Sequence, residues 1–238
     1  MSLPIRWSIL HLEFRRDTES FEAAQRFWRQ VAPNAWDHLT LDQVDGGQGP
    51  HDGQCRLELL LDQGSPLAAA RDEALALGAV LDGEDLIAVQ LRSPGGYRFS
   101  LSALPGPAPA VPPPAELEGY PNRVDQVCLD LPPDAATREI AFWQELTGWE
   151  LRDEPDSEFT VLLRPADQPV RILLQRRDSA DPGDLVTGHL DFSAGPDRRE
   201  LAAVHQELGA TLVGHMEEWS TLRDPAGRVY CLTRRDPA

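Results

Sequence analysis

Apolar and polar positions follow two periodicities along this chain, one typical of strands and one typical of helices. In the second half, the apolar stretch 124–131 predicts a strand. Ile140, Trp143 and Leu146 then share one face of a helix that ends at Gly148. Further strands of this half are predicted at 159–163, 170–175, 186–192, 220–222 and 229–233.

A second helix is predicted after the strand at 186–192. Asp197 and Glu200 have the spacing of a capping box, and Gly209 supplies the stop. The apolar positions are Leu201, Val204 and Leu208, and His205 lies next to Val204, so we expect His205 on the solvated side of this helix.

Two more helix starts can be placed from capping residues. Asp134 is expected to open the helix that ends at Gly148. In the first half, Ser65 as cap, Pro66 at the first helical position and Gly78 as stop frame a helix.

The two halves of the chain are duplicates. With an offset of 131 residues, 58–101 aligns without gaps on 189–232, and 12 of 44 positions are identical. A composition this rich in Leu and Ala would give roughly three matches by chance. Upstream, Phe27-Trp28 faces Phe142-Trp143 in a shifted register, which indicates that the first half lacks residues between about 30 and 57.

A proline-rich segment separates the two copies. Residues 103–122 contain seven prolines, a density that opposes helices and strand ladders and favours a stiff tether. We therefore predict a shortened domain at 1–104, a linker at 105–121 and a second domain at 122–238.

Composition excludes several classes of function. The chain of 238 residues has 39 acidic and 22 basic residues, a net charge of −17, which repels nucleic acid and anionic membranes. It contains no lysine, which excludes Schiff-base chemistry and a P-loop. The scarcity of lysine, isoleucine and asparagine also suggests a GC-rich bacterial genome.

The cellular location is predicted from segments that the sequence lacks. No window has 18 consecutive apolar residues, and Pro4 and Arg6 interrupt the start, so we expect neither a membrane span nor a secretory leader. Cys55, Cys128 and Cys231 are odd in number and scattered, so we expect reduced thiols and a cytoplasmic protein.

The order of elements resembles a known superfamily. A strand-helix-strand-strand-strand unit used twice per half, with a helix ending in Leu-Gly-Ala and a hairpin carrying Asp-Pro-x-Gly, is similar to the vicinal oxygen chelate superfamily. This group includes glyoxalase I, extradiol dioxygenases, fosfomycin resistance enzymes and bleomycin resistance proteins. The motifs at 188–192, 208–210 and 223–232 are most similar to its glyoxalase-like domains.

The resemblance implies a fold and an assembly. The expected class is α+β, with tandem glyoxalase-like domains that each pair two βαβββ-type units into a curled mixed-sheet cup. The two domains would form an intramolecular pseudo-dimer, and further self-association of chains is possible.

The resemblance also implies positions for a divalent metal. Enzymes of this superfamily take ligands from the first strand of each unit and a Glu from the last strand. Those positions fall here at Gln126, His189 and Cys231, with Leu173 or Gln175 at a fourth. Because this set has no carboxylate and includes a thiol, it suits the harder metals poorly. We therefore favour a site without metal or other cofactor, and a metal, if present, would use Gln126, His189 and Cys231.

Several residues are candidates for a ligand site on the same strands. His189 and Asp191 are two residues apart and share one strand face, so His189 is a candidate catalytic base, or alternatively a core histidine. Trp219 is either an aromatic wall or ordinary packing, and Cys231 either a reactive thiol or a small buried residue. The candidate ligand-binding set is Gln126, Gln175, His189, Asp191, Trp219 and Cys231.

Three functions remain open from the sequence. The first hypothesis is a protein that binds a small organic molecule in the second cup without an essential metal, like the bleomycin resistance branch, with the negative chain favouring a cationic ligand. The second is a metal-dependent lyase, isomerase or dioxygenase of glyoxalase type. The third is a structural or partner-binding protein.

Overall fold

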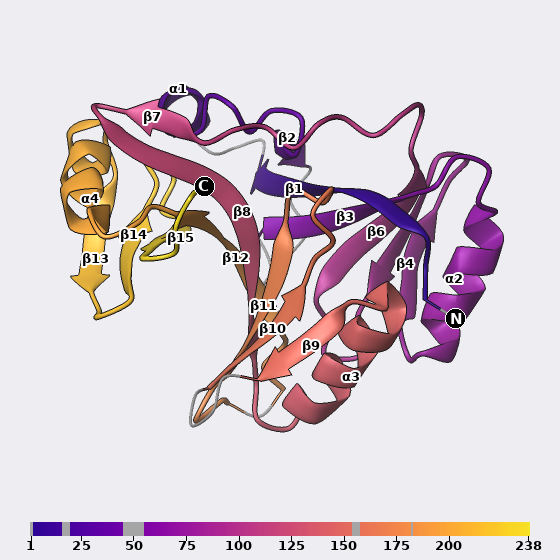
Figure 1. Cartoon of the computed structure of the whole chain (residues 1–238). Coiled ribbons are helices and arrows are strands. Elements are labelled where there is room, and N and C mark those ends of the chain that lie inside the picture. The colour runs from indigo at the N-terminus through magenta and orange to yellow at the C-terminus, as the bar shows by residue number, and fades with distance from the viewer. Residues whose placement is uncertain (1, 16–19, 45–54, 154–157, 182) are drawn as a thin grey trace. The chain divides into compact units, whose positions relative to one another are not determined.

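The computed structural model describes the whole chain except residues 1, 16–19, 45–54, 154–157 and 182 (Figure 1). Within the described residues, fifteen strands and four helices form an α+β structure with two open, curled, mixed sheets. None of the described helices is long and apolar enough to cross a membrane.

The first sheet takes all its strands from the first half of the chain. Its order is β2-β1-β3-β6-β5-β4, with β3 and β6 parallel. The strands are β1 (Ile5–Arg15), β2 (Leu39–Val44), β3 (Cys55–Leu61), β4 (Val80–Glu84), β5 (Ala88–Arg92) and β6 (Arg98–Ala103).

The second sheet takes all its strands from the second half. Its order is β13-β14-β15-β12-β8-β11-β10-β9, and β7 pairs with β8 off this path. The strands are β7 (Ala115–Leu117), β8 (Tyr120–Leu131), β9 (Glu150–Asp153), β10 (Phe159–Leu163), β11 (Arg171–Arg176), β12 (Thr187–Ser193), β13 (Thr211–His215), β14 (Trp219–Arg223) and β15 (Val229–Thr233).

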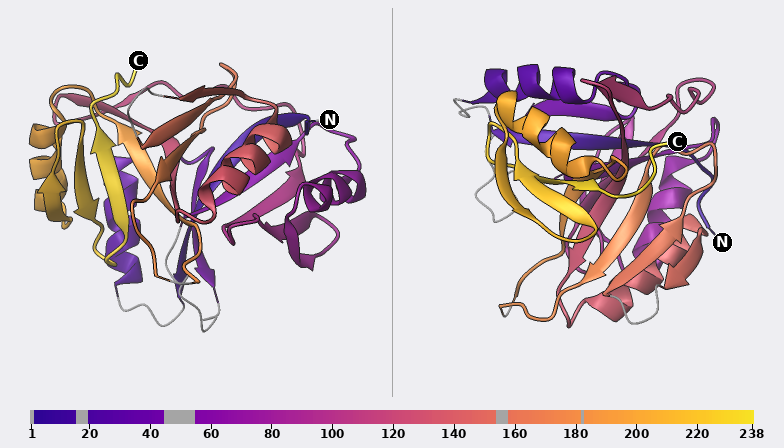
Figure 2. Two further views of the ribbon diagram at one scale, coloured as in Figure 1. Left: turned by 90° about the horizontal axis from the view of Figure 1, so that it is seen from below. Right: turned by 60° about the vertical axis from the view of Figure 1, so that its left-hand side comes forward.

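The four helices cover the sheets. They are α1 (Phe21–Val31), α2 (Leu67–Ala76), α3 (Ala136–Thr147) and α4 (Arg198–Glu207). Figures 1 and 2 show α4 packed along β13, β14 and β15, and α2 packs in the same way on β5 and β6. Gly148 caps α3 in the left-handed conformation, with φ of 66°, as the sequence predicts.

The predicted duplication is confirmed by the topology. The elements β3-α2-β4-β5-β6 and β12-α4-β13-β14-β15 follow the same order, and each copy pairs its first and last strands in parallel. Even the irregularity in the β4–β5 register, between Leu81 and Gly83, recurs between Leu212 and Gly214. Each residue of this bulge thus lies 131 positions from its counterpart.

The shortening of the first copy is also visible. Between α1 and β3 the described residues contain one strand, β2, whereas β9, β10 and β11 follow α3 in the second half. Part of the predicted gap, residues 45–54, lies outside the described residues.

Three predicted helix starts differ in detail from the structure. The helix expected from Asp134 begins at Ala136, and the helix expected to have Ser65 as its cap uses Pro66 instead. Asp197 does occupy the N-cap of α4, but its side chain makes no capping hydrogen bond, so the predicted capping box does not form. These N-termini are fixed by the packing of the helix on its sheet rather than by side-chain caps.

The chain divides into two compact units, each of which draws segments from both halves. The first unit comprises Met1–Leu10, Arg56–Val111 and Val127–Gly188, and the second unit comprises His11–Cys55, Pro112–Gln126 and His189–Ala238. The domain limits predicted from the sequence follow chain order instead and stay a prediction.

Residues of the proline-rich segment make packing contacts and hydrogen bonds with other described residues. Residues 105–114 form no helix or strand, as predicted, but the ladder of β7 with β8 begins directly after them. In the first unit Val111 packs on a core of Trp7, Leu60 and Leu104. In the second unit the Asn34 side chain donates to the carbonyls of Pro113 and Pro114, each at 3.4 Å.

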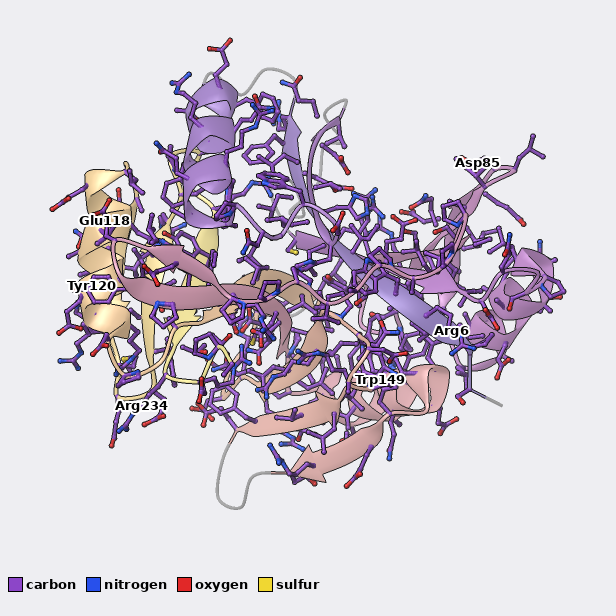
Figure 3. All side chains as sticks on the ribbon, turned by 45° about the horizontal axis from the view of Figure 1, so that its top comes forward. Arg6, Asp85, Glu118, Tyr120, Trp149 and Arg234 are labelled. Atoms are coloured by element: carbon purple, nitrogen blue, oxygen red, sulfur yellow. The ribbon has the colours of Figure 1, made fainter. Side chains whose placement is uncertain are left out.

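The tip of the β4–β5 hairpin is held by a side chain. Figure 3 labels Asp85 at this tip. Its Oδ1 accepts hydrogen bonds from the backbone N–H groups of Ile87 and Ala88 at 2.8 and 2.9 Å. This local Asx-type turn fixes the hairpin although the side chains of Leu86 and Ile87 are exposed.

In the first unit a buried carboxylate joins a helix to a turn. Glu139 of α3 is fully buried, and its Oε1 accepts from the Trp143 indole N–H at 2.9 Å. Its Oε2 accepts from the backbone N–H of Gly95, in the turn between β5 and β6, at 2.8 Å. Burial raises the pKa of Glu139, while hydrogen bonds from Ser93, Trp143 and Gly95 oppose that rise.

In the second unit a similar contact joins a helix to a turn, but the carboxylate belongs to the turn and not to the helix. The Trp28 indole of α1 donates at 2.9 Å to Oδ2 of Asp224, in the turn between β14 and β15. The Asp224 Oδ1 accepts from the backbone N–H groups of Ala226 and Arg228, each at 2.9 Å. Burial raises the pKa of Asp224, as it does for Glu139.

The two joints are related by the internal repeat. Asp224 aligns with Ser93, and Glu139 aligns with Ala24. Each joint therefore has one carboxylate, one indole donor and backbone donors from the turn, but the turn supplies the carboxylate in one unit and the helix supplies it in the other. Gly95 leaves room for the helix carboxylate, because a Cβ at this position would lie only 2.9 Å from the Glu139 Oε2. The aligned residue in the second unit, where the helix supplies no carboxylate, is Ala226.

The expectation that His205 is solvated is wrong. His205 is fully buried on the α4 face that also carries Arg198, Leu201 and Ala202, one turn apart along the helix. Its Nδ1 lies 2.9 Å from the Tyr230 hydroxyl, among Phe27, Phe192 and Tyr230. Burial lowers the pKa of His205 to about 3, so the imidazole is neutral at physiological pH.

We expect Glu139→Ala and Asp224→Ala each to lower the free energy of unfolding by about 2–4 kcal/mol, because an indole and a turn N–H lose their buried acceptor. Urea denaturation at neutral pH measures the loss. Glu145→Ala, on the exposed side of α3, is the matched control and should change stability by less than about 0.5 kcal/mol. A loss in Glu139→Ala no larger than in this control would contradict the role of the joint.

His205 should make stability depend on pH below neutrality. Its folded pKa lies below the unfolded value of 6.5, so the stabilisation is complete above pH 6.5 and is lost as pH falls toward 3. The expected slope is about 1.4 kcal/mol per pH unit. Urea titrations at pH 6.5, 5.5 and 5.0 should show this slope in the native protein and a flatter one in His205→Gln. Identical slopes would disprove the assignment to His205.

Candidate functional site

Within the second unit, one face of the sheet collects polar side chains from four strands. β12 and β15 run parallel with Asp191 opposite Cys231, and β14 and β15 run antiparallel with Thr221 opposite Cys231. Since directly paired residues project to the same side, Asp191, Cys231 and Thr221 share this face. The other side carries Leu190, Leu222 and Tyr230, which pack beneath α4.

A chain of short contacts links the polar residues of this face. The Gln126 amide of β8 donates a short hydrogen bond to Oδ2 of Asp191. The His189 Nε2 lies 3.4 Å from Oδ1 of Asp191 and 3.8 Å from Sγ of Cys231. The Thr221 Oγ1 in turn lies 3.6 Å from the same sulfur. We call Gln126, His189, Asp191, Thr221 and Cys231 the polar face.

The members of the polar face differ in their access to solvent. The side chain of His189 is 16% exposed, whereas the side chain of Asp191 is 3% exposed. Gln126 and Cys231 are also buried. A molecule that approaches this sheet therefore meets the imidazole first, with a buried carboxylate and thiol behind it.

The electrostatics of this face keep the Cys231 thiol protonated and the nearby Arg235 side chain charged. Burial, and then the charge of Asp191, raise the pKa of Cys231, and the contacts with His189 and Thr221 oppose that rise only partly. Burial would lower the pKa of Arg235, but its bidentate ion pair with Asp125 and the charge of Asp191 raise it. The guanidinium thus remains charged and attracts the Asp191 carboxylate.

The structure brings together four of the six candidate residues predicted from the sequence: Gln126, His189, Asp191 and Cys231. Trp219 is half-buried on β14, two residues from Thr221 and on the same side of the sheet. Gln175 belongs to the first unit, where its Oε1 lies 3.8 Å from Sγ of Cys128.

Sequence reasoning missed two residues of this environment. Thr221 could have been found, because the turn at 224–227 sets the register of the hairpin and places Thr221 opposite Cys231. Arg235 could not, because it follows the last strand and its ion pair spans 110 residues of sequence to Asp125.

The residues at the expected metal positions do not fit the divalent metal that the resemblance implies. The Gln126 amide nitrogen donates to Asp191, and the position expected to hold Glu has the Cys231 thiol with its raised pKa. A thiol must lose its proton to bind a metal, and a neutral amide and a thiolate suit iron, manganese or nickel less well than carboxylates do.

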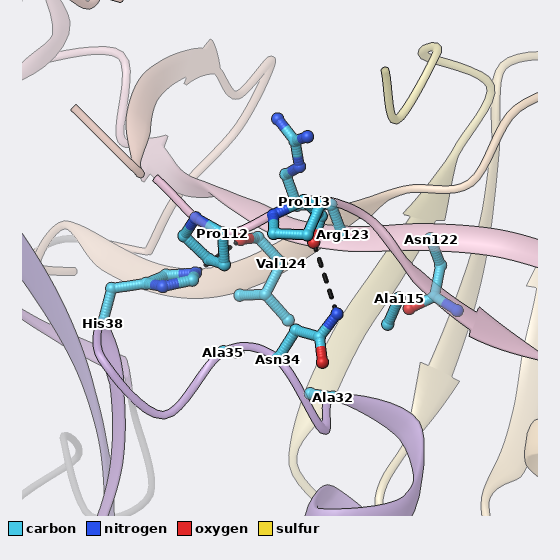
Figure 4. Close-up of a pocket in the computed structure, with 10 residues that line it drawn as sticks. All are labelled: Ala32, Asn34, Ala35, His38, Pro112, Pro113, Ala115, Asn122, Arg123 and Val124. Carbon is cyan, nitrogen blue, oxygen red and sulfur yellow. Dashed lines mark hydrogen bonds between the residues drawn. The ribbon is translucent and has the colours of Figure 1, made fainter. Parts of the chain in front are cut away.

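A small cavity of the second unit lies away from this face. Figure 4 shows it between the α1–β2 connection and the segment from Pro112 to Val124, where the His38 Nε2 lies 2.8 Å from the carbonyl of Val124. Its volume is about 10 Å³, close to the minimum for one water molecule and far below what an organic ligand needs.

Comparison with known proteins identifies part of the sequence. Residues 126–233 match the family model described as a glyoxalase-like domain. The match includes β12, α4 and the three strands that follow, which together form one copy of the internal repeat. A search of curated protein sequences finds no match.

Solved structures resemble the fold over nearly the whole chain. A 2,3-dioxygenase from Pseudomonas is 14% identical with a TM-score of 0.60, covering 98% of this chain and 93% of that chain. Homoprotocatechuate 2,3-dioxygenase from Arthrobacter globiformis is 11% identical with a TM-score of 0.61, covering 98% and 81%. A variant of 4-hydroxymandelate synthase from Streptomyces coelicolor is 12% identical with a TM-score of 0.57, covering 100% and 94%.

These structures share a sheet architecture with the chain, and at such low identity the likeness concerns the fold alone. Extradiol dioxygenases and glyoxalase-like domains are members of one superfamily. Residues 126–233 are therefore similar to a glyoxalase-like domain, and the whole chain shares the two-domain fold of these solved structures.

Proposed function

We propose that the polar face binds a small organic molecule without an essential metal. His189 is the group that contacts the ligand from the solvent side, and Asp191 supplies a negative charge behind it. Trp219, on the same side of the sheet, supplies an apolar surface next to these polar groups. The role is one of binding or sequestration, like that of the bleomycin resistance proteins of this superfamily.

The observation that carries the proposal is the chemistry of the expected metal positions. Cys231 stands where the superfamily's enzymes have Glu, and its raised pKa keeps it a neutral thiol at physiological pH. Gln126 is engaged with Asp191. These residues can hydrogen-bond a ligand as they stand, whereas holding a metal would require a proton to leave the thiol.

The sign of the charge suggests the class of ligand. The chain carries a net charge of −17 and the polar face includes a buried carboxylate, so a cationic organic ligand is attracted at long and at short range. The same charge disfavours nucleic acid and anionic lipid as partners, and a cytoplasmic location remains our prediction from the sequence.

A second candidate function has one observation in its favour. The His189 Nε2 and the Asp191 Oδ1 lie 3.4 Å apart, and an imidazole with a carboxylate is a donor pair common in Lewis-acid sites. This arrangement would suit a metal-dependent lyase, isomerase or dioxygenase, and two structural neighbours are named as dioxygenases.

Binding of benzamidine, a cationic probe, tests the proposed function. We expect Asp191→Asn and His189→Ala to weaken its affinity about tenfold or more, since each removes about 1.4 kcal/mol or more of interaction. His215→Ala, an exposed histidine of the same unit, should leave affinity unchanged. Calorimetric titration at low and high salt measures the effect, and affinity that neither variant changes would contradict the proposal.

Metal analysis separates the two candidates. Protein purified without chelator should contain far less than one metal ion per chain by mass spectrometry. One equivalent of metal in the native protein that is lost in His189→Ala would instead establish the second candidate.

The protonated thiol gives a further prediction. The pH midpoint for alkylation of Cys231, followed by mass spectrometry of its peptide, should lie above that of a free cysteine because burial and Asp191 raise its pKa. Asp191→Asn should move the midpoint to lower pH, and Thr221→Val, which removes a stabilising contact, should move it to higher pH. Midpoints that shift in the opposite directions would contradict the assigned electrostatics.

A further inference from the structure

The second unit carries an open groove lined by α1, the residues after α4 and the turn between β14 and β15. Its volume is about 470 Å³, within the range of small-molecule sites. Apolar atoms of Phe27, Leu208 and Pro225 line it, and Arg26 and Arg29 border it. Of the residues that line the groove, two are arginines and none is acidic, in a chain whose net charge is −17.

The internal repeat explains why this groove is open. In the first unit, Arg138 of α3 extends from the helix to the turn between β5 and β6 and donates to the carbonyl of Pro94 at 3.0 Å. The aligned pair in the second unit is Ala23 and Pro225, so a methyl group stands where a guanidinium spans the same gap.

The basic residues at the border are specific to the second unit. Arg26 and Arg29 of α1 align with Ala141 and Gln144 of α3. The helix α1 thus lacks a counterpart of Arg138, which would fill the groove. It carries Arg26 and Arg29 instead, three residues apart on one helix face.

We propose that this groove binds an organic carboxylate with an apolar body. A guanidinium offers two parallel N–H donors that match the two oxygens of a carboxylate, and Arg29 is an exposed residue that lines the groove. The apolar body then covers Leu208 and Pro225. This site is distinct from the polar face and does not depend on the proposed function.

The neighbouring charges leave the arginines available to a ligand. Arg26 forms an ion pair with Glu22 at 3.8 Å, with both side chains more than 70% exposed. An exposed pair of this kind contributes little stability, so a ligand carboxylate that also buries apolar surface replaces it readily.

Titration of the full chain with benzoate tests the proposal, with chemical shifts of the Gly209 and Gln30 amides as the readout, because both residues line the groove. Benzoate should shift these amides and bind at least tenfold more tightly than benzyl alcohol, which lacks the charge, or inorganic phosphate, which lacks the apolar body. Equal affinity for all three compounds, or shifts elsewhere only, would overturn the proposal.

Two kinds of variant then probe the groove. Ala23→Arg reproduces the arrangement of Arg138 and should reduce benzoate affinity at least tenfold by filling the space. Arg26→Gln with Arg29→Gln, both exposed positions, should reduce it to the level of benzyl alcohol. His189→Ala alters the polar face and should leave benzoate affinity unchanged. Benzoate binding therefore tests the groove independently of ligand binding at the polar face. Benzoate affinity that survives both groove variants would disprove the site.

Discussion

A carboxylate buried between a tryptophan indole and the backbone of a turn holds each unit of this protein together. Glu139 does this in the first unit and Asp224 in the second. The desolvation of these groups raises their pKa, yet each accepts hydrogen bonds from both the helix and the turn. Because buried donors without acceptors are costly, the helix cannot shift along its sheet without losing them.

The position of the polar face depends on this constraint. Asp224 begins the turn that leads into β15, and its contacts with the N–H groups of Ala226 and Arg228 set where that strand starts. The register of β15 then places Cys231 opposite both Asp191 and Thr221. Interactions under α1 and α4 on one side of the sheet thus determine which side chains meet on the other side.

Much of the fold could be predicted from sequence because its information is local or repeated. Strand periodicity and the 131-residue repeat predict six of the nine described strands of the second half, and Gly148 marks a helix end. The short strands β7, β9 and β13 are not predicted. The apolar positions Leu201, Val204 and Leu208 predict the wrong place for His205, because the buried face of α4 runs through Arg198, Leu201, Ala202 and His205.

The candidate site was predictable only in part, for a physical reason. Gln126, His189, Asp191 and Cys231 could be grouped because strand alternation and the superfamily's pattern place them on shared faces. The sequence pattern could not choose between Leu173 and Gln175 for the fourth position, because pattern alone does not set the register of a strand. The contacts of Arg235 arise from packing between segments distant in sequence.

The swapped carboxylates also determine which copies can pair. In the first unit the turn comes from the first half and the helix from the second, while in the second unit the origins are reversed. Two second halves would bring the acidic groups of Glu139 and Asp224 into one buried joint, and two first halves would bring Ser93 and Ala24 together with no carboxylate for the indole. At these joints each half is therefore complementary to the other half and not to a second copy of itself.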